Sequence, residues 1–376
     1  MDYNAVVLGQ RLSQQGSVDD VGPQPLREVF DIDKDQFSDI VDAQRPVVLR
    51  GVARDWPLID AWHRSPRALS DYLVGLDIGG DVVTVTAEPG IEGRLGYEPG
   101  TTRLNHVHSL QPLAEVLRKI LAAADTEDPP SYWIGGLAAD GRMPGLRAAN
   151  DIDLTPPEAE PHLTICNRVT IPAHIDSADN IAIVVAGRRR FTVFPPDQVA
   201  NLYIGPLDPT PAGVPISLVS QDAPDLDRYP RFADALRAGF VADLGPGDAI
   251  YIPYLWWHGV QSLDNLNVLV NFWWYSHETG EELPWIPLLN AAHQLFGGMP
   301  AKQRQAWRAL FDYWAFAQHG DPLDHLTAQQ RPASISNQTV ARFREQVAEL
   351  LRAAEADANP ATAGDPAPSQ PPTATG

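Results

Sequence analysis

The sequence predicts a mainly β fold, a sandwich or barrel, with helices before and after it. The first observation is that residues 131–275 are dense in short apolar runs separated by Gly, Pro and Asp turns, the pattern of an all-β sandwich or barrel. The second is that the apolar residues beyond position 283 recur with a helical period. The third is size, because 376 residues, 44% of them apolar, can form two average domains or one large domain with appendages.

The N-terminal part predicts an α+β opening. Residues 1–25 are polar and weakly patterned, so we expect them to be loosely held. A capped helical pattern around Phe37 and Ile40 then leads into a short apolar strand, PVVLRG, at residues 46–51. The stretch DVVTVTAE at residues 81–88 alternates with period two and predicts a further strand.

The β region contains a tight turn and then gives way to helices. The tetrapeptide GPGD at residues 245–248 is a turn signal between two apolar runs. Residues 353–376 are rich in Ala, Pro and Thr and have almost no large apolar groups, which predicts disorder because burial cannot offset their ordering entropy. Two sets of apolar residues each share a helical face, namely Trp307, Leu310, Phe311 and Trp314, and Val340, Phe343, Val347 and Leu350.

Composition excludes several classes of protein. The 48 acidic residues against 28 basic ones give a formal charge of −20, which repels a phosphate backbone, so we expect no nucleic-acid partner. No window approaches 18 uninterrupted apolar residues, and the first residues lack the pattern of a signal peptide. We therefore expect a cytoplasmic protein without a membrane partner. Cys166 is the single cysteine, which excludes an intrachain disulfide and predicts a buried, inert thiol.

A histidine and an aspartate lie two positions apart in IPAHIDSADN, residues 171–180. On a strand, residues i and i+2 project from the same face, so His174 and Asp176 would point together into the space that the sheet encloses. Two histidines and one carboxylate on one side of an ion form the site of non-haem Fe(II) oxygenases. The best-placed second histidine is His258 in GDAIYIPYLWWHGV, which follows a predicted strand. A hydrogen-bonded His–Asp pair in the core is the alternative.

Three consecutive arginines stand in GRRRFTVFPP, residues 187–196. Strand alternation places Arg189 on the same side as Phe191 and Val193, and Arg188 on the opposite side. An arginine on an apolar face needs a carboxylate, either from an internal salt bridge or from a dicarboxylate cosubstrate.

The strand NVLVNFWWY, residues 267–275, raises a similar question. Asn271 shares a face with Leu269 and Trp273, and a buried amide needs partners that a ligand can supply. Four tryptophans are candidates for the wall of a pocket, with core packing as the alternative: Trp256, Trp257, Trp273 and Trp274.

Together these motifs resemble a known family. The run IPAHIDSADNIAIVVAGRRRFTVFPPDQVANLYIGPLD, followed by GDAIYIPYLWWHGVQSLDNLNVLVNFWW, is similar to the jumonji-C, or cupin-like, Fe(II)/2-oxoglutarate oxygenases. Bacterial cupin-like members look closest, and the asparaginyl hydroxylase that inhibits hypoxia-inducible factor is more distant. The resemblance covers residues 25–320 and is strongest across 165–275. It implies a double-stranded β-helix, or jelly roll, of eight strands flanked by helices.

Composition and periodicity, together with the resemblance, predict a division of the chain, and the resemblance implies a set of site residues. The division is a loose segment at 1–25, a jumonji-C/cupin-like catalytic domain at 26–280, a helical region at 281–352 and a disordered tail at 353–376. The implied Fe(II) ligands are His174, Asp176 and His258. The implied contacts of 2-oxoglutarate are Arg189 on its distal carboxylate, Asn180 and Asn271 beside it, Tyr132 as a phenol donor, and Thr170 as a substitute for the threonine that Ile171 replaces.

The function that follows is a 2-oxoglutarate-dependent dioxygenase, a hydroxylase of a protein side chain or a small molecule. It would consume dioxygen and 2-oxoglutarate and release succinate and carbon dioxide. The alternatives are a non-catalytic cupin-type protein that binds a metal and an organic acid, and a metal-dependent cupin enzyme without an oxo-acid cosubstrate, which would not require Arg189. No chromatin-reader or zinc module is visible, which disfavours histone demethylation.

An excess of apolar residues in the C-terminal helices predicts a homodimer, because exposed apolar patches often mark subunit interfaces. The alternative is that they pack on the β domain. The residues concerned are Trp285, Leu288, Leu289, Trp307, Leu310, Phe311, Trp314 and Phe316.

Overall fold

The computed structural model describes residues 22–211, 213–276 and 285–331, together with residues 342, 345, 348, 349 and 352. The chain divides into two compact units, Met1–Leu283 and Pro284–Gly376. The predicted tail at 353–376, most of the predicted loose segment at 1–25 and the predicted helical face of Val340, Phe343, Val347 and Leu350 lie outside the described residues.

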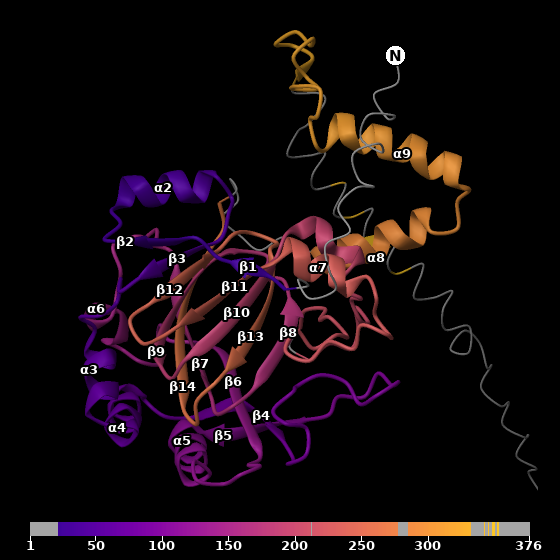
Figure 1. The fold of residues 1–376 in the computed structure, drawn as a ribbon. Coiled ribbons are helices and arrows are strands. Elements are labelled where there is room, and N and C mark those ends of the chain that lie inside the picture. Colours follow the sequence, from indigo (N-terminus) through magenta and orange to yellow (C-terminus); the bar gives the residue numbers. More distant parts are fainter. Residues whose placement is uncertain are drawn as a thin grey trace, which may run out of the picture. The chain divides into compact units, whose positions relative to one another are not determined.

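The first unit is built on eight strands, β7 to β14, that form two facing antiparallel sheets (Figure 1). One sheet contains the order β12-β9-β14-β7 and the other contains β11-β10-β13-β8. This is the double-stranded β-helix that the sequence resemblance predicts. The strands are β7 (Glu160–Cys166), β8 (Thr170–His174), β9 (Asp179–Ala186), β10 (Arg189–Phe194), β11 (Phe240–Leu244), β12 (Ala249–Ile252), β13 (Trp257–Ser262) and β14 (Asn267–Trp274).

Six further strands extend the two sheets. The larger sheet has the order β2-β3-β12-β9-β14-β7-β6-β4-β5, and β1 joins the smaller sheet parallel to β11. The strands predicted at 46–51 and 81–88 are β3 and β4. The bounds are β1 (Gln24–Pro25), β2 (Glu28–Phe30), β3 (Val47–Arg50), β4 (Asp81–Ala87), β5 (Val107–Pro112) and β6 (Ser131–Ala138).

Helices cover the outer face of the larger sheet (Figure 1). The predicted helix around Phe37 forms as α2, whose N-terminus is closed by a capping box between Asp33 and Gln36. Side chains from α2 to α5 share one buried cluster with Ile181 and Ile183 of β9. The helices are α2 (Lys34–Asp42), α3 (Pro57–Arg64), α4 (Pro66–Leu76), α5 (Leu113–Ala122), α6 (Leu146–Ala149), the 3-10 helix η2 (Pro196–Ala200) and α7 (Phe232–Ala238).

Strand β9 is buried along its whole length and separates two cores. Its outward side chains, such as Ile181 and Ile183, pack under the helices and belong to the outer core. Ala182 and Val184 pack between the two sheets and belong to the inner core. Because side chains alternate along a strand, Asn180 projects to the same side as Ala182, into the space between the sheets. The same alternation that makes two cores therefore presents one polar side chain to the interior.

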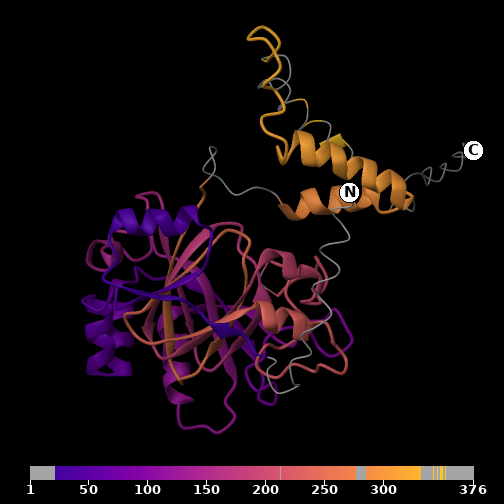
Figure 2. The ribbon, with the colours of Figure 1, turned by 45° about the horizontal axis from the view of Figure 1, so that its top comes forward.

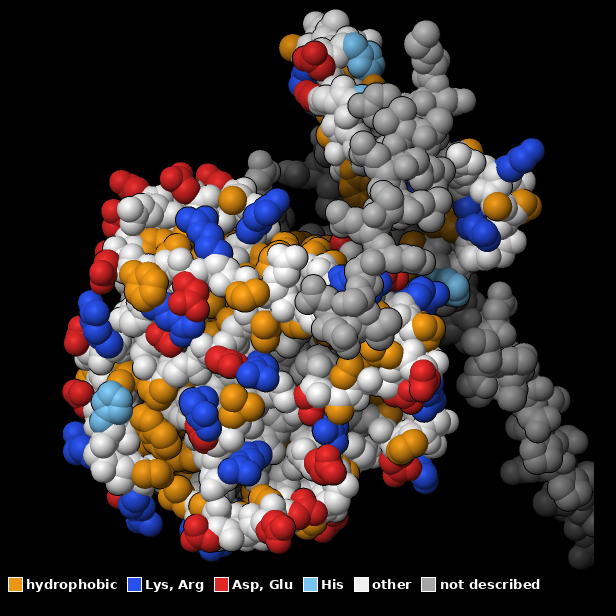
Figure 3. All heavy atoms as spheres, viewed as in Figure 1, with side chains coloured by type: hydrophobic (Ala, Val, Ile, Leu, Met, Phe, Trp, Pro, Cys, Tyr) orange, Lys and Arg blue, Asp and Glu red, His pale blue; other side chains and the backbone are white. Residues whose placement is uncertain are grey.

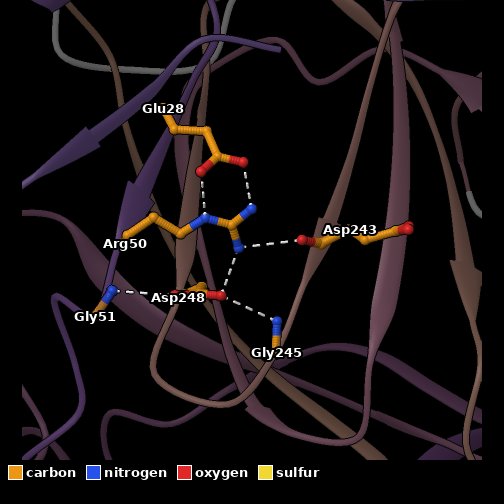
Figure 4. Close-up of polar contacts among 6 residues, drawn as sticks. All are labelled: Glu28, Arg50, Gly51, Asp243, Gly245 and Asp248. Carbon is orange, nitrogen blue, oxygen red and sulfur yellow. Dashed lines mark hydrogen bonds and ion pairs between the residues drawn. The ribbon is translucent and has the colours of Figure 1, made fainter. Parts of the chain in front are cut away.

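A charged network closes one end of the fold at the predicted GPGD turn (Figure 4). Arg50 at the end of β3 donates to both carboxylate oxygens of Glu28, to Asp248 Oδ2 at 2.7 Å and to the carbonyl of Asp243. The Asp248 carboxylate also accepts from the backbone N–H groups of Gly51 and Gly245, each at 3.1 Å. The network therefore ties the N-terminal strands to the turn between β11 and β12.

Replacing Asp248 with alanine is expected to lower the free energy of unfolding by about 2–4 kcal/mol, because it removes a charge-assisted bond to Arg50 and two bonds to backbone N–H groups. Asp243→Ala is the control, since the side chain of Asp243 pairs with Arg190 at the surface and such pairs contribute about 1 kcal/mol or less. Urea denaturation measures both. Equal losses in the two variants would contradict the role assigned to Asp248.

The second unit contains a helical hairpin of α8 (Trp285–Phe296) and α9 (Ala301–Trp314) (Figure 2). Phe296 contacts the rings of Trp307 and Phe311, with ring centroids 5.1 and 5.9 Å apart. Neither helix contains a buried residue, and Leu288, Leu310 and Trp314 are about half exposed or more. Within the described residues, no helix combines the length and the apolar character that crossing a bilayer requires.

We predict that this exposed apolar face is covered by a second copy of the chain. Light scattering at micromolar concentration is then expected to give twice the mass of 41.1 kDa, and truncation after Glu282 is expected to restore the monomer. A monomeric full-length chain would instead support packing of these helices on the β domain.

Candidate metal centre and active-site cavity

Two neighbouring strands bring the predicted histidines together. β8 and β13 pair in antiparallel fashion, and His174 and His258 are direct partners in that ladder. Asp176 lies two residues beyond the end of β8, so the period-two argument does not by itself position its side chain. Its backbone carbonyl instead accepts from the N–H of Leu255, in the loop before β13, at 3.2 Å. Sheet pairing therefore joins two residues that are 84 positions apart in the chain.

The three side chains have the geometry of a metal centre. One ligand atom from each of His174, Asp176 and His258 lies within 4.8 Å of the other two. His258 Nε2 is 3.6 Å from Asp176 Oδ2, and the two imidazole rings are 4.3 Å apart between centroids. No other cluster of three or more metal-ligating side chains of this kind occurs in the described part of the chain.

Backbone carbonyls orient both imidazoles toward the centre. Nδ1 of His174 is 3.0 Å from the carbonyl of Pro172, and Nδ1 of His258 is 3.1 Å from the carbonyl of Trp256. A carbonyl only accepts, so Nδ1 carries the proton in each ring and Nε2 presents its lone pair. This is the tautomer that a metal bound at Nε2 requires.

Burial keeps His258 in the form that binds metal. The side chain is 4% exposed, and desolvation together with the neighbouring His174 lowers the pKa of His258 to about 4, although Asp176 opposes the shift. The imidazole is therefore neutral at physiological pH, and neutral imidazole is a metal ligand.

Two asparagines fix the carboxylate. Asn271 on β14 donates from Nδ2 to Asn180 Oδ1 at 3.0 Å, and Asn180 on β9 donates to Asp176 Oδ2 at 3.0 Å. Both amides are buried, at 5% and 1% exposed. The structure thus brings Asn180 and Asn271 to the site, where Asn180 contacts the carboxylate of Asp176 and Asn271 contacts Asn180.

Asp179 is a supporting residue that sequence reasoning missed. Its carboxylate is 1% exposed and accepts from the hydroxyl of Tyr251 at 2.7 Å, the hydroxyl of Ser276 at 2.6 Å and the backbone N–H of Tyr254 at 3.3 Å. The bond to Tyr254 fixes the loop before β13. In that loop, the N–H of Leu255 contacts Asp176 and the carbonyl of Trp256 contacts His258. The available signal was an acidic residue at the start of a continuous apolar run.

A cavity of about 450 Å³ extends from the cluster of His174, Asp176 and His258 between the two sheets. This volume lies in the range of about 300–1,000 Å³ that is typical of small-molecule sites. Its apolar lining includes Phe191, Ile252 and Leu269. Its other described lining includes Arg189, Thr164, Cys166, Ser262, Trp133, Trp273, His106 and His108.

Arg189 reaches this cavity as the strand-face argument predicts. It is 3% exposed, and its guanidinium donates from Nη2 to the sulfur of Cys166 at 3.5 Å, while Nε has no partner among the described residues. Among the described residues, no carboxylate forms an ion pair with its guanidinium. Arg188 and Arg190 differ, since they pair at the surface with Asp264 and Asp243. Burial without a carboxylate lowers the pKa of Arg189.

The structure does not bring Tyr132 or Thr170 into the cavity. Tyr132 packs against the outer core, and its neighbour Trp133 faces the cavity instead. Thr170 is buried on β8 away from the cavity, and Ile171 lines it. Alternation explains Tyr132, because a shift of one residue reverses the face, whereas on β8 an irregularity in the pairing with β13 breaks the alternation between Thr170 and His174.

The four tryptophans proposed for the wall divide between the cavity and the cores. Trp273 lines the cavity, whereas Trp274 stacks on Tyr251 in the outer core and Trp256 packs against the inner one. Sequence reasoning missed Thr164 and Cys166, although they alternate with apolar residues in LTIC and therefore share a face.

Comparison with known proteins agrees with this geometry. A family model described as a cupin-like domain matches residues 33–280, which is more than half of the chain. The chain belongs to the cupin-like domain family. This confirms the resemblance on which the jelly roll was predicted, and the matched range contains His174, Asp176 and His258.

Individual relatives match over shorter or more divergent stretches. tRNA wybutosine-synthesizing protein 5 of Danio rerio is 28% identical over 263 residues, covering 65% of this chain and 73% of the relative. HSPB1-associated protein 1 of Bos taurus is 29% identical over 252 residues, which cover 62% of this chain and 49% of the relative. Lysine-specific demethylase JMJ31 of Arabidopsis thaliana is 38% identical over 104 residues, which cover 28% of this chain and 18% of the relative. The chain thus spans about half or less of the last two.

Proposed function

We propose that the protein is an Fe(II)- and 2-oxoglutarate-dependent oxygenase that hydroxylates a protein side chain or a small molecule. The observation that carries this proposal is Arg189, a buried cation without a carboxylate partner among the described residues that lines the same cavity as the His174, Asp176 and His258 cluster. A buried, unpaired guanidinium is costly unless a ligand supplies its counter-ion. A dicarboxylate with one end at a metal and the other at an arginine meets that need.

The residues fit the metal. Two neutral imidazoles and one carboxylate with open positions are the ligand set of non-haem Fe(II) oxygenases. Here Nδ1 of each imidazole is bonded to a backbone carbonyl, and Asn180 holds the carboxylate of Asp176. Fe(II) and 2-oxoglutarate, when bound, supply the oxidising chemistry, in which dioxygen is consumed and succinate and carbon dioxide are released.

The protein's own groups position the reactants. Arg189 binds the distal carboxylate of 2-oxoglutarate through its planar fork, and the apolar lining of the cavity limits the access of water. The indole N–H of Trp273 lines the same cavity, is buried and has no hydrogen-bond partner among the described residues, so it is a donor available to a ligand.

Charge bears on the class of substrate. The relatives are named for acting on lysine in one case and on tRNA in another. The formal charge of −20 disfavours a nucleic-acid substrate here, and on the face in Figure 3 the basic side chains are interspersed with acidic ones rather than gathered into one area. A protein side chain or a small molecule therefore has the better physical support.

Succinate formation tests the proposal. Protein with Fe(II), 2-oxoglutarate and air is expected to release succinate slowly, and a genuine substrate from a panel of peptides, metabolites and tRNA is expected to accelerate the release and gain one oxygen atom by mass. Protein that binds iron and 2-oxoglutarate but never forms succinate would point to the non-catalytic cupin-type alternative.

A further inference from the structure

The end of the cavity around Arg189 contains a thiol and a hydroxyl as well as the guanidinium. Ser262 on β13 lies directly opposite Arg189 in the ladder with β10, and both side chains line the cavity. Cys166 at the end of β7 comes from the other sheet. The three residues thus come from both sheets of the barrel, and all are buried: Arg189 is 3% exposed, Ser262 6% and Cys166 0%.

The sulfur of Cys166 is the shared partner of the other two groups. It lies 3.5 Å from Nη2 of Arg189 and 3.2 Å from the hydroxyl oxygen of Ser262. A thiol is only a weak donor and a weak acceptor, so neither contact replaces a bond to an anion. Arg189 and Ser262 are therefore held in place but keep most of their capacity to donate.

The charge of the thiol decides what this arrangement can bind. Burial raises the pKa of Cys166, although Arg189 and Ser262 favour the thiolate, so the thiol is neutral at physiological pH. A neutral partner orients the guanidinium without cancelling its charge. An aspartate at the same position would form an internal ion pair with Arg189 and leave no cation for a ligand.

We propose that Cys166 is a positioning residue that determines specificity, holding the guanidinium of Arg189 and the hydroxyl of Ser262 open for the far carboxylate of a 2-oxo dicarboxylic acid. The inference rests on the proposed function and deepens it, because it assigns the preference for a dicarboxylate to the absence of charge at position 166. Ser262 then donates to the same carboxylate, and its removal is expected to weaken binding by about two- to tenfold.

Charge at position 166 can be varied at constant size. Cys166→Asp and Cys166→Asn have nearly the same volume, and Cys166→Ser is a smaller neutral variant. The full-length protein loaded with Mn(II) is titrated calorimetrically with 2-oxoglutarate and with 2-oxopentanoate, in which a methyl group replaces the far carboxylate. The ratio of the two affinities is the readout, since a loss of fold or metal would weaken both ligands together.

The wild-type protein is expected to prefer 2-oxoglutarate by more than about 30-fold, the cost of leaving one buried charge unpaired. Cys166→Asp is expected to reduce this preference to about one, whereas Cys166→Asn and Cys166→Ser are expected to keep most of it. A Cys166→Asp protein that retains the preference for 2-oxoglutarate, or an equal loss of that preference in the Asp and Asn variants, would overturn this inference but not the proposed function. A wild-type protein without any preference would instead overturn the proposed function.

Discussion

Arg189→Met is expected to remove measurable 2-oxoglutarate binding while metal binding persists and the fold becomes no less stable. The reason is that Arg189 is buried at 3% exposure without a carboxylate in the described residues. In a ligand complex the guanidinium would be one member of a buried charge pair, and truncating one member of such a pair costs about 2–5 kcal/mol, or about 30- to 4,000-fold in affinity. In the free protein the same change removes an uncompensated buried charge and fills its volume with an apolar side chain, which favours folding.

Arg188→Met is the matched control for this prediction. Its guanidinium is largely exposed and pairs with Asp264 on the other side of the strand. Calorimetric titration of the Mn(II)-loaded variants with 2-oxoglutarate, and thermal unfolding without ligand, measure the two expected effects. A large fall in the unfolding temperature of Arg189→Met would show that the arginine supports the fold itself, and equal effects at both positions would exclude the assigned strand register.

The second large effect is expected at the metal centre. His174→Ala or Asp176→Ala removes one of three ligands and is expected to weaken Fe(II) or Mn(II) binding by more than about 100-fold, because losing a group that merely orients a ligand already costs about 10–100-fold. The fold is expected to persist, since each side chain is partly exposed at the cavity and belongs to neither buried cluster.

Metal titration monitored by calorimetry or by the electron paramagnetic resonance of Mn(II) measures this loss. His63→Ala is the control, because His63 is an exposed histidine on α3 away from the cavity. A His174→Ala protein that binds iron as tightly as the wild type would contradict the proposed ligand set, and so would an equal loss in His63→Ala.

Local pattern was sufficient for most of the framework. Period-two alternation predicted the strand at 81–88 and the inward side of Arg189, and the GPGD tetrapeptide predicted the turn before β12. These predictions succeed because alternation is a property of the extended backbone itself and needs no knowledge of the partner strand. The family resemblance supplied the arrangement of the strands as a double-stranded β-helix.

Local pattern failed where one residue of register decides the outcome. Tyr132 and Thr170 lie one position from Trp133 and Ile171, which face the cavity. For Tyr132 the register of β6 decides the face, and for Thr170 the irregular pairing of β8 with β13 does so, and neither leaves a clear mark in the sequence. Asp179 was missed because its three donors come from segments about 70 to 100 residues away.

The sequence by itself determined the chemical types at the site, the spacing of His174 and Asp176, and the apolar faces that drive the barrel to form. Only the tertiary structure decided that His258 lies opposite His174, that Asn180 holds Asp176, and that the cation of Arg189 meets a thiol instead of a carboxylate. The physical reason is that burial and pairing are collective properties. A side chain's charge and hydrogen-bonding groups belong to the residue, but whether they are satisfied depends on which distant strands the closed barrel places beside it.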